Sequence, residues 1–187
     1  MTSDAPDAAP AFVGVIEAVD AFTGGFGRLL AWLFIPLVGG LTWEVAARYV
    51  FNAPTLWAFD LTYMLYGTIF MLGASYALLK GAHIRTDMLW EKFSDRTKGK
   101  IDTLAYVLFF FPAMIMLFST SIDDAIYSFS INEKSEQTAW RPVIWPFKSV
   151  IPLTALLLLI QGTSELLKSV HAWRTGRIYR PTEKIEV

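Results

Sequence analysis

The stretch LTYMLYGTIFMLGASYALL occupies residues 61–79 and contains no charged side chain. A bilayer core of about 30 Å is crossed by roughly 20 helical residues, so this run alone is long enough to span a membrane. Backbone amides in lipid must be hydrogen-bonded within the segment, which favours a helix over a strand. The stretch therefore predicts a transmembrane helix and sets the class of the protein.

Three further apolar runs flank it, at about residues 26–50, 101–122 and 150–167. The chain of 187 residues is 54% hydrophobic and 15% aromatic, which is more than a soluble domain of this size usually carries. We therefore expect an all-α membrane protein with one domain over residues 1–187 and four transmembrane helices.

Lysine and arginine are concentrated in residues 80–100 and in the tail after residue 167. The positive-inside rule places both segments in the cytoplasm, and an even number of spans places the N-terminus there as well. Residues 12–25 and 84–100 carry apolar positions at helical spacing among charged ones, so we expect two amphipathic helices at the membrane interface. The N-terminus lacks the pattern of a cleaved secretory signal, and we expect it to remain in the mature chain.

Composition and charge exclude several classes of function. Cysteine is absent, which excludes disulfides and thiolate chemistry. The basic residues flank apolar runs and form no nucleic-acid motif, so phospholipid is an expected partner and nucleic acid is not. Ionisable residues are functional candidates inside a bilayer, but none stands near the midpoint of any of the four runs. We expect no enzyme, and no catalytic, substrate-binding or metal site.

Charged residues near the ends of the spans are candidates for contacts with another chain or for structural roles. Glu44 and Arg48 are spaced i,i+4 in the outward third of the first span, in the order that favours an ion pair. Asp60 opens the second helix, where a carboxylate can cap backbone amides and meet the positive end of the helix dipole.

Small residues recur along the second helix. In lipid, small side chains let helices approach closely, and packing drives their association. We therefore expect this face to contact another helix. Its members are Gly67, Gly73, Ala74 and Gly81.

The outward loop at residues 123–148 carries aromatic and charged side chains together. An aromatic belt at the membrane edge accounts for them, and so does a docking surface for another protein. Both interpretations stay open. The candidate docking residues are Glu136, Trp140, Arg141 and Trp145.

The segment RYVFNAPTLWAFDLTYMLYGTIFMLGASYALLKGAHIRTDML, residues 48–89, resembles the core of the DctQ family, the small membrane subunit of tripartite ATP-independent periplasmic (TRAP) transporters. The chain departs from the family's pattern at Phe59, where an acid is common, and at Asp60, where glutamate is more frequent. The positions that carry the resemblance are Arg48, Trp57, Asp60, Leu72, Gly73, Ala74, Gly81, His83, Ile84 and Asp87.

The resemblance implies a three-part secondary transporter in the bacterial inner membrane. A periplasmic binding protein captures the solute, a large membrane subunit carries the solute and sodium sites, and the small subunit is a scaffold without a cofactor. Residues 132–167 also resemble the longer branch of the family, which is associated with carboxylates such as 2-oxoacids or with mannitol-like solutes, and among these we expect a carboxylate. If the chain is such a scaffold, we expect His83 and Asp87 to fix the turn from the second span into the surface helix.

Two other interpretations stay open. A haem or quinone anchor of a redox complex would use His83 and His171, which lie at the cytoplasmic ends of two spans. A small proton-coupled exporter would use Glu44 as its intramembrane acid.

Overall fold

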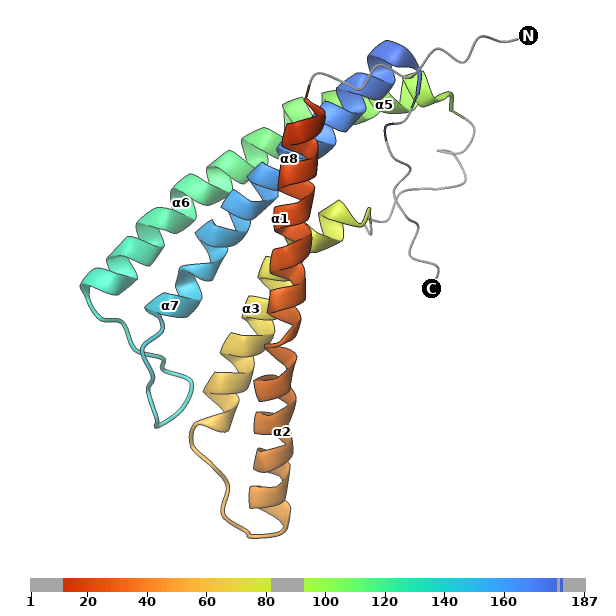
Figure 1. Ribbon diagram of the computed structural model, residues 1–187. Coiled ribbons are helices and arrows are strands. Elements are labelled where there is room, and N and C mark those ends of the chain that lie inside the picture. The colour runs from red at the N-terminus through yellow and green to blue at the C-terminus, as the bar shows by residue number, and fades with distance from the viewer. Residues whose placement is uncertain (1–11, 82–92, 178, 180–187) are drawn as a thin grey trace.

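The computed structural model describes residues 12–81, 93–177 and 179. In this part of the chain the regular structure is helical, apart from one isolated β-bridge between Lys134 and Val143. Four of its helical stretches are long and apolar enough to cross a membrane, which confirms the expected all-α, four-span fold (Figure 1). The stretches are Val13–Tyr49, Ala58–Leu79, Asp95–Ser130 and Trp145–Thr175.

The charge-free run forms α3, Ala58–Leu79, close to its expected bounds. The helix ends at Lys80, and Gly81 follows with a φ of 65°, a left-handed conformation that glycine adopts without steric cost. The Gly81 amide donates to the Leu78 carbonyl at 3.1 Å. Gly81 was expected on the small-residue face of the helix, but it ends the helix instead.

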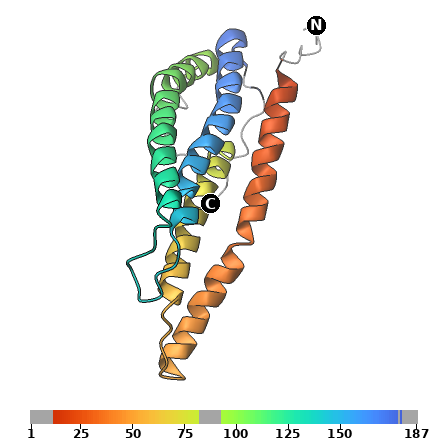
Figure 2. The same ribbon diagram turned by 90° about the vertical axis from the view of Figure 1, so that its left-hand side faces the viewer.

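The first span consists of α1, Val13–Ala31, and α2, Phe34–Tyr49, which follow one another nearly in line (Figure 2). Pro36 has no N–H to donate to the Trp32 carbonyl, which explains a break at residues 32–33. The expectation of a separate interfacial helix at 12–25 was therefore wrong in its boundary. That segment is the beginning of α1, and it packs against α3 and α8.

The third stretch contains α5, Asp95–Ala105, then a π-helical segment η1, Tyr106–Phe110, and α6, Phe111–Ser130. Pro112 removes one amide donor at the start of α6, and wider π-type hydrogen bonding is a usual response to such a defect. The chain bends here (Figure 2). The expected span at 101–122 thus begins inside α5 and continues to Ser130.

The second expected interfacial helix, at 84–100, lies partly outside the described residues. Its described end forms the beginning of α5, where the Ser94 hydroxyl accepts the Thr97 amide as an N-cap. This end packs against α8, so α5 is joined to the bundle.

The central helix is α8, Val150–Thr175, preceded by the short helix α7, Trp145–Lys148. It contacts α1, α3, α5, α6 and α7, and it ends where Gly176 takes a left-handed conformation with a φ of 72°. It runs further than the expected 150–167. At the same end of the molecule, the amino-terminal part of α1, α5 and the carboxyl-terminal part of α8 lie together (Figure 1).

The backbones of α5 and α8 approach one another closely at Gly99. A Cβ atom placed on Gly99 would lie 2.5 Å from the Trp173 nitrogen and 2.7 Å from the Ser169 oxygen. Only glycine leaves room for two helix backbones this close. The extra length of three of the four stretches therefore forms a packed layer at one end of the bundle.

Candidate functional site

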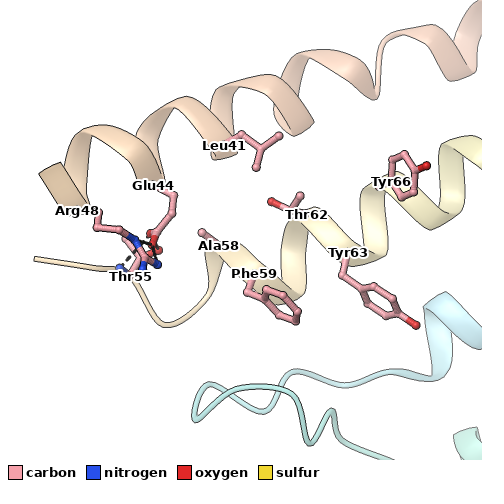
Figure 3. Close-up of a pocket in the computed structure, with 9 residues that line it drawn as sticks. All are labelled: Leu41, Glu44, Arg48, Thr55, Ala58, Phe59, Thr62, Tyr63 and Tyr66. Carbon is pink, nitrogen blue, oxygen red and sulfur yellow. Dashed lines mark hydrogen bonds and ion pairs between the residues drawn. The ribbon is translucent and has the colours of Figure 1, made fainter.

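A groove between α2 and α3 lies at the opposite end, beside the connection between these helices (Figure 3). Its volume is about 360 Å³, and Leu41 and Thr62 face one another across it. Glu44, Arg48 and Thr55 form a polar outer end beside the α2–α3 connection, and the rest of the lining is chiefly apolar and aromatic. The lining residues are Leu41, Glu44, Arg48, Thr55, Ala58, Phe59, Thr62, Tyr63 and Tyr66.

Glu44 organises the outer end of this groove. One of its carboxylate oxygens accepts from Arg48 Nη2 at 2.5 Å, which confirms the i,i+4 ion pair expected from the sequence. The other oxygen accepts from the Thr55 amide at 3.0 Å and from the Thr55 hydroxyl at 2.5 Å. The carboxylate therefore holds the α2–α3 connection against α2, a role that the i,i+4 spacing did not indicate.

An aromatic ridge runs along α3 beside the groove. Its members are spaced at four, three and four residues, which places them on one face of the helix. All four are exposed, and the Tyr63 ring also packs on Phe147 of α7 with centroids 5.1 Å apart. The ridge consists of Phe59, Tyr63, Tyr66 and Phe70.

Asp60 is completely buried, but it does not act as the expected helix cap. No side chain caps the amino-terminal end of α3, where Trp57 is the N-cap residue. Instead, the Ser135 hydroxyl donates to Asp60 Oδ1 at 2.6 Å, and the Thr138 hydroxyl donates to Oδ2. The carboxylate thus fixes the α6–α7 loop, residues 131–144, onto the amino-terminal end of α3.

The same two hydroxyls order the loop itself. Ser135 Oγ accepts from the Gln137 amide and Thr138 Oγ1 accepts from the Trp140 amide, both at 3.2 Å. Hydroxyl-to-backbone bonds of this kind define tight turns. The loop is therefore a folded structure that is anchored at one buried carboxylate.

Three of the four expected docking residues lie at the exposed tip of this loop. Glu136, Trp140 and Arg141 are exposed, and Arg141 has a left-handed φ of 46°, which is uncommon outside glycine and asparagine. Trp145 lies at the base of the loop, where its ring packs edge-on against Phe129 with centroids 5.1 Å apart. The structure thus groups three of these residues and separates the fourth.

A second ion pair closes the base of the loop. Lys148 Nζ lies 2.8 Å from Glu133 Oε2 and 3.3 Å from Asp124 Oδ2. The hydrogen bond from Lys148 holds the pKa of Glu133 below its ordinary value. Because this pKa is lowered in the folded chain, the contribution of the pair is present above the usual carboxyl pKa and is lost as pH falls through the lowered one.

The small-residue face of α3 packs within this chain. A Cβ on Gly67 would lie 2.7 Å from the Phe147 ring, so this glycine makes room for α7. A Cβ on Gly73 would lie 3.9 Å from Leu30 of α1, and Ala74 is half-buried. These contacts account for the glycines without a second chain.

His83 and Asp87 lie outside the described residues, so their expected role in the turn stays a prediction. The haem interpretation also required His83. Its other member, His171, packs edge-on against the Tyr179 ring with centroids 6.0 Å apart.

A polar cluster between α1 and α8 was missed by the sequence interpretation. Lys168 Nζ lies 2.8 Å from Asp20 Oδ2 and 2.6 Å from Glu165 Oε1. Two fully buried neighbours, Gln161 and Ser164, donate to Asp20 Oδ1 at 3.1 Å and 2.7 Å. The spacing of Gln161, Ser164, Glu165 and Lys168 on one helical face was the available signal.

Replacing Asp60 by asparagine should release the α6–α7 loop. Asparagine keeps the shape of the side chain, but its amide group is a donor and faces a hydroxyl that donates to Asp60 in the wild-type chain. Losing a hydrogen bond to a charged group should lower the free energy of unfolding by about 1–2 kcal/mol. Limited proteolysis of the loop and detergent-phase thermal unfolding measure the two effects. The matched control is Asp123→Asn on the exposed face of α6, and equal behaviour of both variants would contradict the anchoring role.

Comparison with known proteins assigns a family to this arrangement. Over 157 residues the chain is 26% identical to the sialic acid TRAP transporter permease protein SiaT of Haemophilus influenzae, a match that covers 80% of this chain and 23% of that protein. Over 66 residues it is 24% identical to the small permease protein SiaQ of the sialic acid TRAP transporter of Vibrio cholerae, covering 35% of this chain and 38% of the relative. The chain thus matches well under half the length of either relative.

The family described as "Tripartite ATP-independent periplasmic transporters, DctQ component" matches residues 37–172. This range includes the groove, the anchored loop and most of α8. Because the match covers more than half of the chain, the protein belongs to the DctQ component family of tripartite ATP-independent periplasmic transporters.

Proposed function

We propose that this chain is the scaffolding small subunit of a TRAP-type secondary transporter in the bacterial inner membrane. It holds a large membrane subunit, which carries the solute and sodium sites, and it works with a periplasmic binding protein. The observation that supports this most is the family match over four apolar stretches whose ion pairs lie near their ends. Such a bundle can brace a neighbouring subunit, but its midplane offers a hydrophilic solute no charged partner.

The proposed solute is a carboxylate. Both relatives named above are sialic acid permeases by name, and sialic acid is an acidic sugar. The identity of these relatives to this chain is 26% and 24%, so they support the chemical class of the solute and not one compound.

The test is purification of a tagged copy from its native membrane, followed by reconstitution. We expect a larger membrane protein to co-purify, and we expect vesicles that contain this chain alone to accumulate no carboxylate. Accumulation by the chain alone would favour the exporter interpretation. A Soret band in the purified chain would favour the haem interpretation, and either result would overturn the proposal.

The tip of the α6–α7 loop is the proposed contact for the binding protein. Reversing both charges, with Glu136→Lys and Arg141→Glu, should lower binding-protein-dependent uptake several-fold because rim charges control encounter between proteins. The amount of assembled membrane complex should not change, because both residues are exposed.

The loop variant leaves the net charge unchanged, and Lys100→Glu, an exposed reversal on α5 at the opposite end of the bundle, is the control for charge reversal away from the loop. Uptake should be measured at two salt concentrations, because an electrostatic docking contact weakens with screening. Equal uptake by the loop variant and the control would remove the loop from the docking surface.

A further inference from the structure

Three hydroxyl groups border the α2–α3 groove without a hydrogen-bond partner in the described part of the chain. They belong to Thr62, Tyr63 and Tyr66. Tyr66 stands eight residues inside α3, about 12 Å along the helix, so its backbone lies within the hydrocarbon core. A polar group in that environment is costly unless another group bonds to it.

The α2 helix, which forms one side of the groove, has few packing contacts with the rest of the chain. α2 packs chiefly against α3, and only Leu37 and Ala47 are buried along it. Leu41 on α2 is 45% exposed, and Tyr66 on α3 is 62% exposed. The two helices therefore present a joint outer face that no other described segment covers.

The chemistry of this face distinguishes between two kinds of occupant. A lipid acyl chain would fill the apolar part of the groove but offers no acceptor or donor to the hydroxyls. Tyr63 and Tyr66 both line the groove and belong to the ridge on one face of α3 (Figure 3), so a helix lying over the aromatic ridge would reach both hydroxyls. Polar side chains that bond across helices are a usual means of helix association in membranes.

We propose that the groove and the aromatic ridge form the surface that binds a transmembrane helix of the large subunit. Apolar side chains of that helix enter the groove beside Leu41, and its hydrogen-bonding side chains meet the hydroxyls of Tyr63 and Tyr66. At the outer end, the Arg48 guanidinium, 57% exposed, fixes the depth of the partner helix. This inference rests on the proposed function, because it requires a large subunit.

The first test removes the hydroxyls and keeps the rings. Tyr63→Phe combined with Tyr66→Phe should lower the affinity for the large subunit about five- to tenfold, as expected for two interhelical hydrogen bonds. The matched control is Tyr127→Phe on α6, a tyrosine that is also 62% exposed. The readout is the amount of large subunit retained on the tagged chain during a detergent dilution series.

The second test fills the groove. Leu41→Trp should remove most of the co-purified large subunit, and Ile115→Trp on the exposed face of α6 should leave it unchanged. The thermal unfolding of each variant chain on its own should match that of the wild type, because these side chains are exposed. If Leu41→Trp unfolds at a lower temperature than the wild type, Leu41→Phe takes its place. The amount of large subunit retained is then measured in the same way.

The third test uses the absence of native cysteine. Tyr66→Cys should cross-link to the large subunit when that subunit carries cysteines along its membrane helices, and Tyr127→Cys should not. Cross-links from Tyr127→Cys alone would overturn the inference.

The outcomes separate the two proposals. If the wild-type chain captures no large subunit, the proposed function fails. If it captures the large subunit and both the double phenylalanine variant and Leu41→Trp retain it fully, only the surface inference fails. A phospholipid that co-purifies with the isolated chain and is lost in Leu41→Trp, while the large subunit stays bound, would also overturn the inference.

Discussion

Replacing Lys168 by methionine should destabilise the isolated chain more than any other single change considered above. Lys168 lies between Asp20 and Glu165, and the three side chains are 16%, 17% and 14% exposed. Without the ammonium group, two neighbouring carboxylates stay poorly solvated and repel one another. Removing one partner of such a pair should lower the free energy of unfolding by about 2–4 kcal/mol, somewhat less than for a fully buried pair.

Unfolding by SDS, followed by circular dichroism, measures this loss. Lys100→Met is the matched control, because Lys100 is exposed on α5. The triple variant Asp20→Asn, Glu165→Gln, Lys168→Met should recover a large part of the stability, because it removes the uncompensated charges together with the cation. A single variant as stable as the Lys100 control would show that the cluster contributes nothing to the contact of α1 with α8.

Replacing Gly99 by alanine should separate α5 from α8. The added Cβ would meet backbone atoms of α8 at 2.5 Å, 2.7 Å and 2.9 Å, and backbone cannot move aside as a flexible side chain can. Overpacking of this kind should lower the free energy of unfolding by about 1–3 kcal/mol. The same SDS titration measures it, and hydrogen exchange along residues 95–105 should show the local loosening.

Gly25→Ala on α1 is the control for the change in helix propensity. A Cβ at Gly25 meets nothing within 4 Å, so alanine there should be neutral or stabilising by up to about 1 kcal/mol. The two substitutions are chemically identical and should have opposite signs. A stabilising effect of Gly99→Ala would contradict the close approach of the α5 and α8 backbones.

The number and type of the spanning elements could be predicted because they depend on local composition. A charge-free apolar run in lipid has few alternatives to a helix, and α3 accordingly lies close to its expected range. The Glu44–Arg48 pair was also accessible, because i,i+4 neighbours meet on any helix. Pro36 and Pro112 can be read from the sequence. The helix break near the first and the π-helical segment near the second could not, because they depend on how the surrounding structure replaces the lost hydrogen bonds.

The roles of individual side chains were harder to predict when their partners lie far away in the chain. Asp60 was expected to cap its own helix, but its partners are Ser135 and Thr138. Asp20 lies within the interfacial helix expected at residues 12–25, but it forms an ion pair with Lys168 of α8. Gly67 and Gly73 were expected to contact another helix, and the helices they meet belong to this chain. Each case depends on contacts that only the packing of the helices creates.

The amino-acid sequence by itself determined that the protein is a bundle of four apolar helices with its charges near their ends, because the cost of exposing amides or charges to lipid is a local property. Only the tertiary structure decided which carboxylate anchors which loop, where two backbones touch at Gly99, and which face of α2 and α3 remains uncovered. These features arise from the crossing positions of long helices, and small differences in packing among many similar apolar surfaces fix those positions.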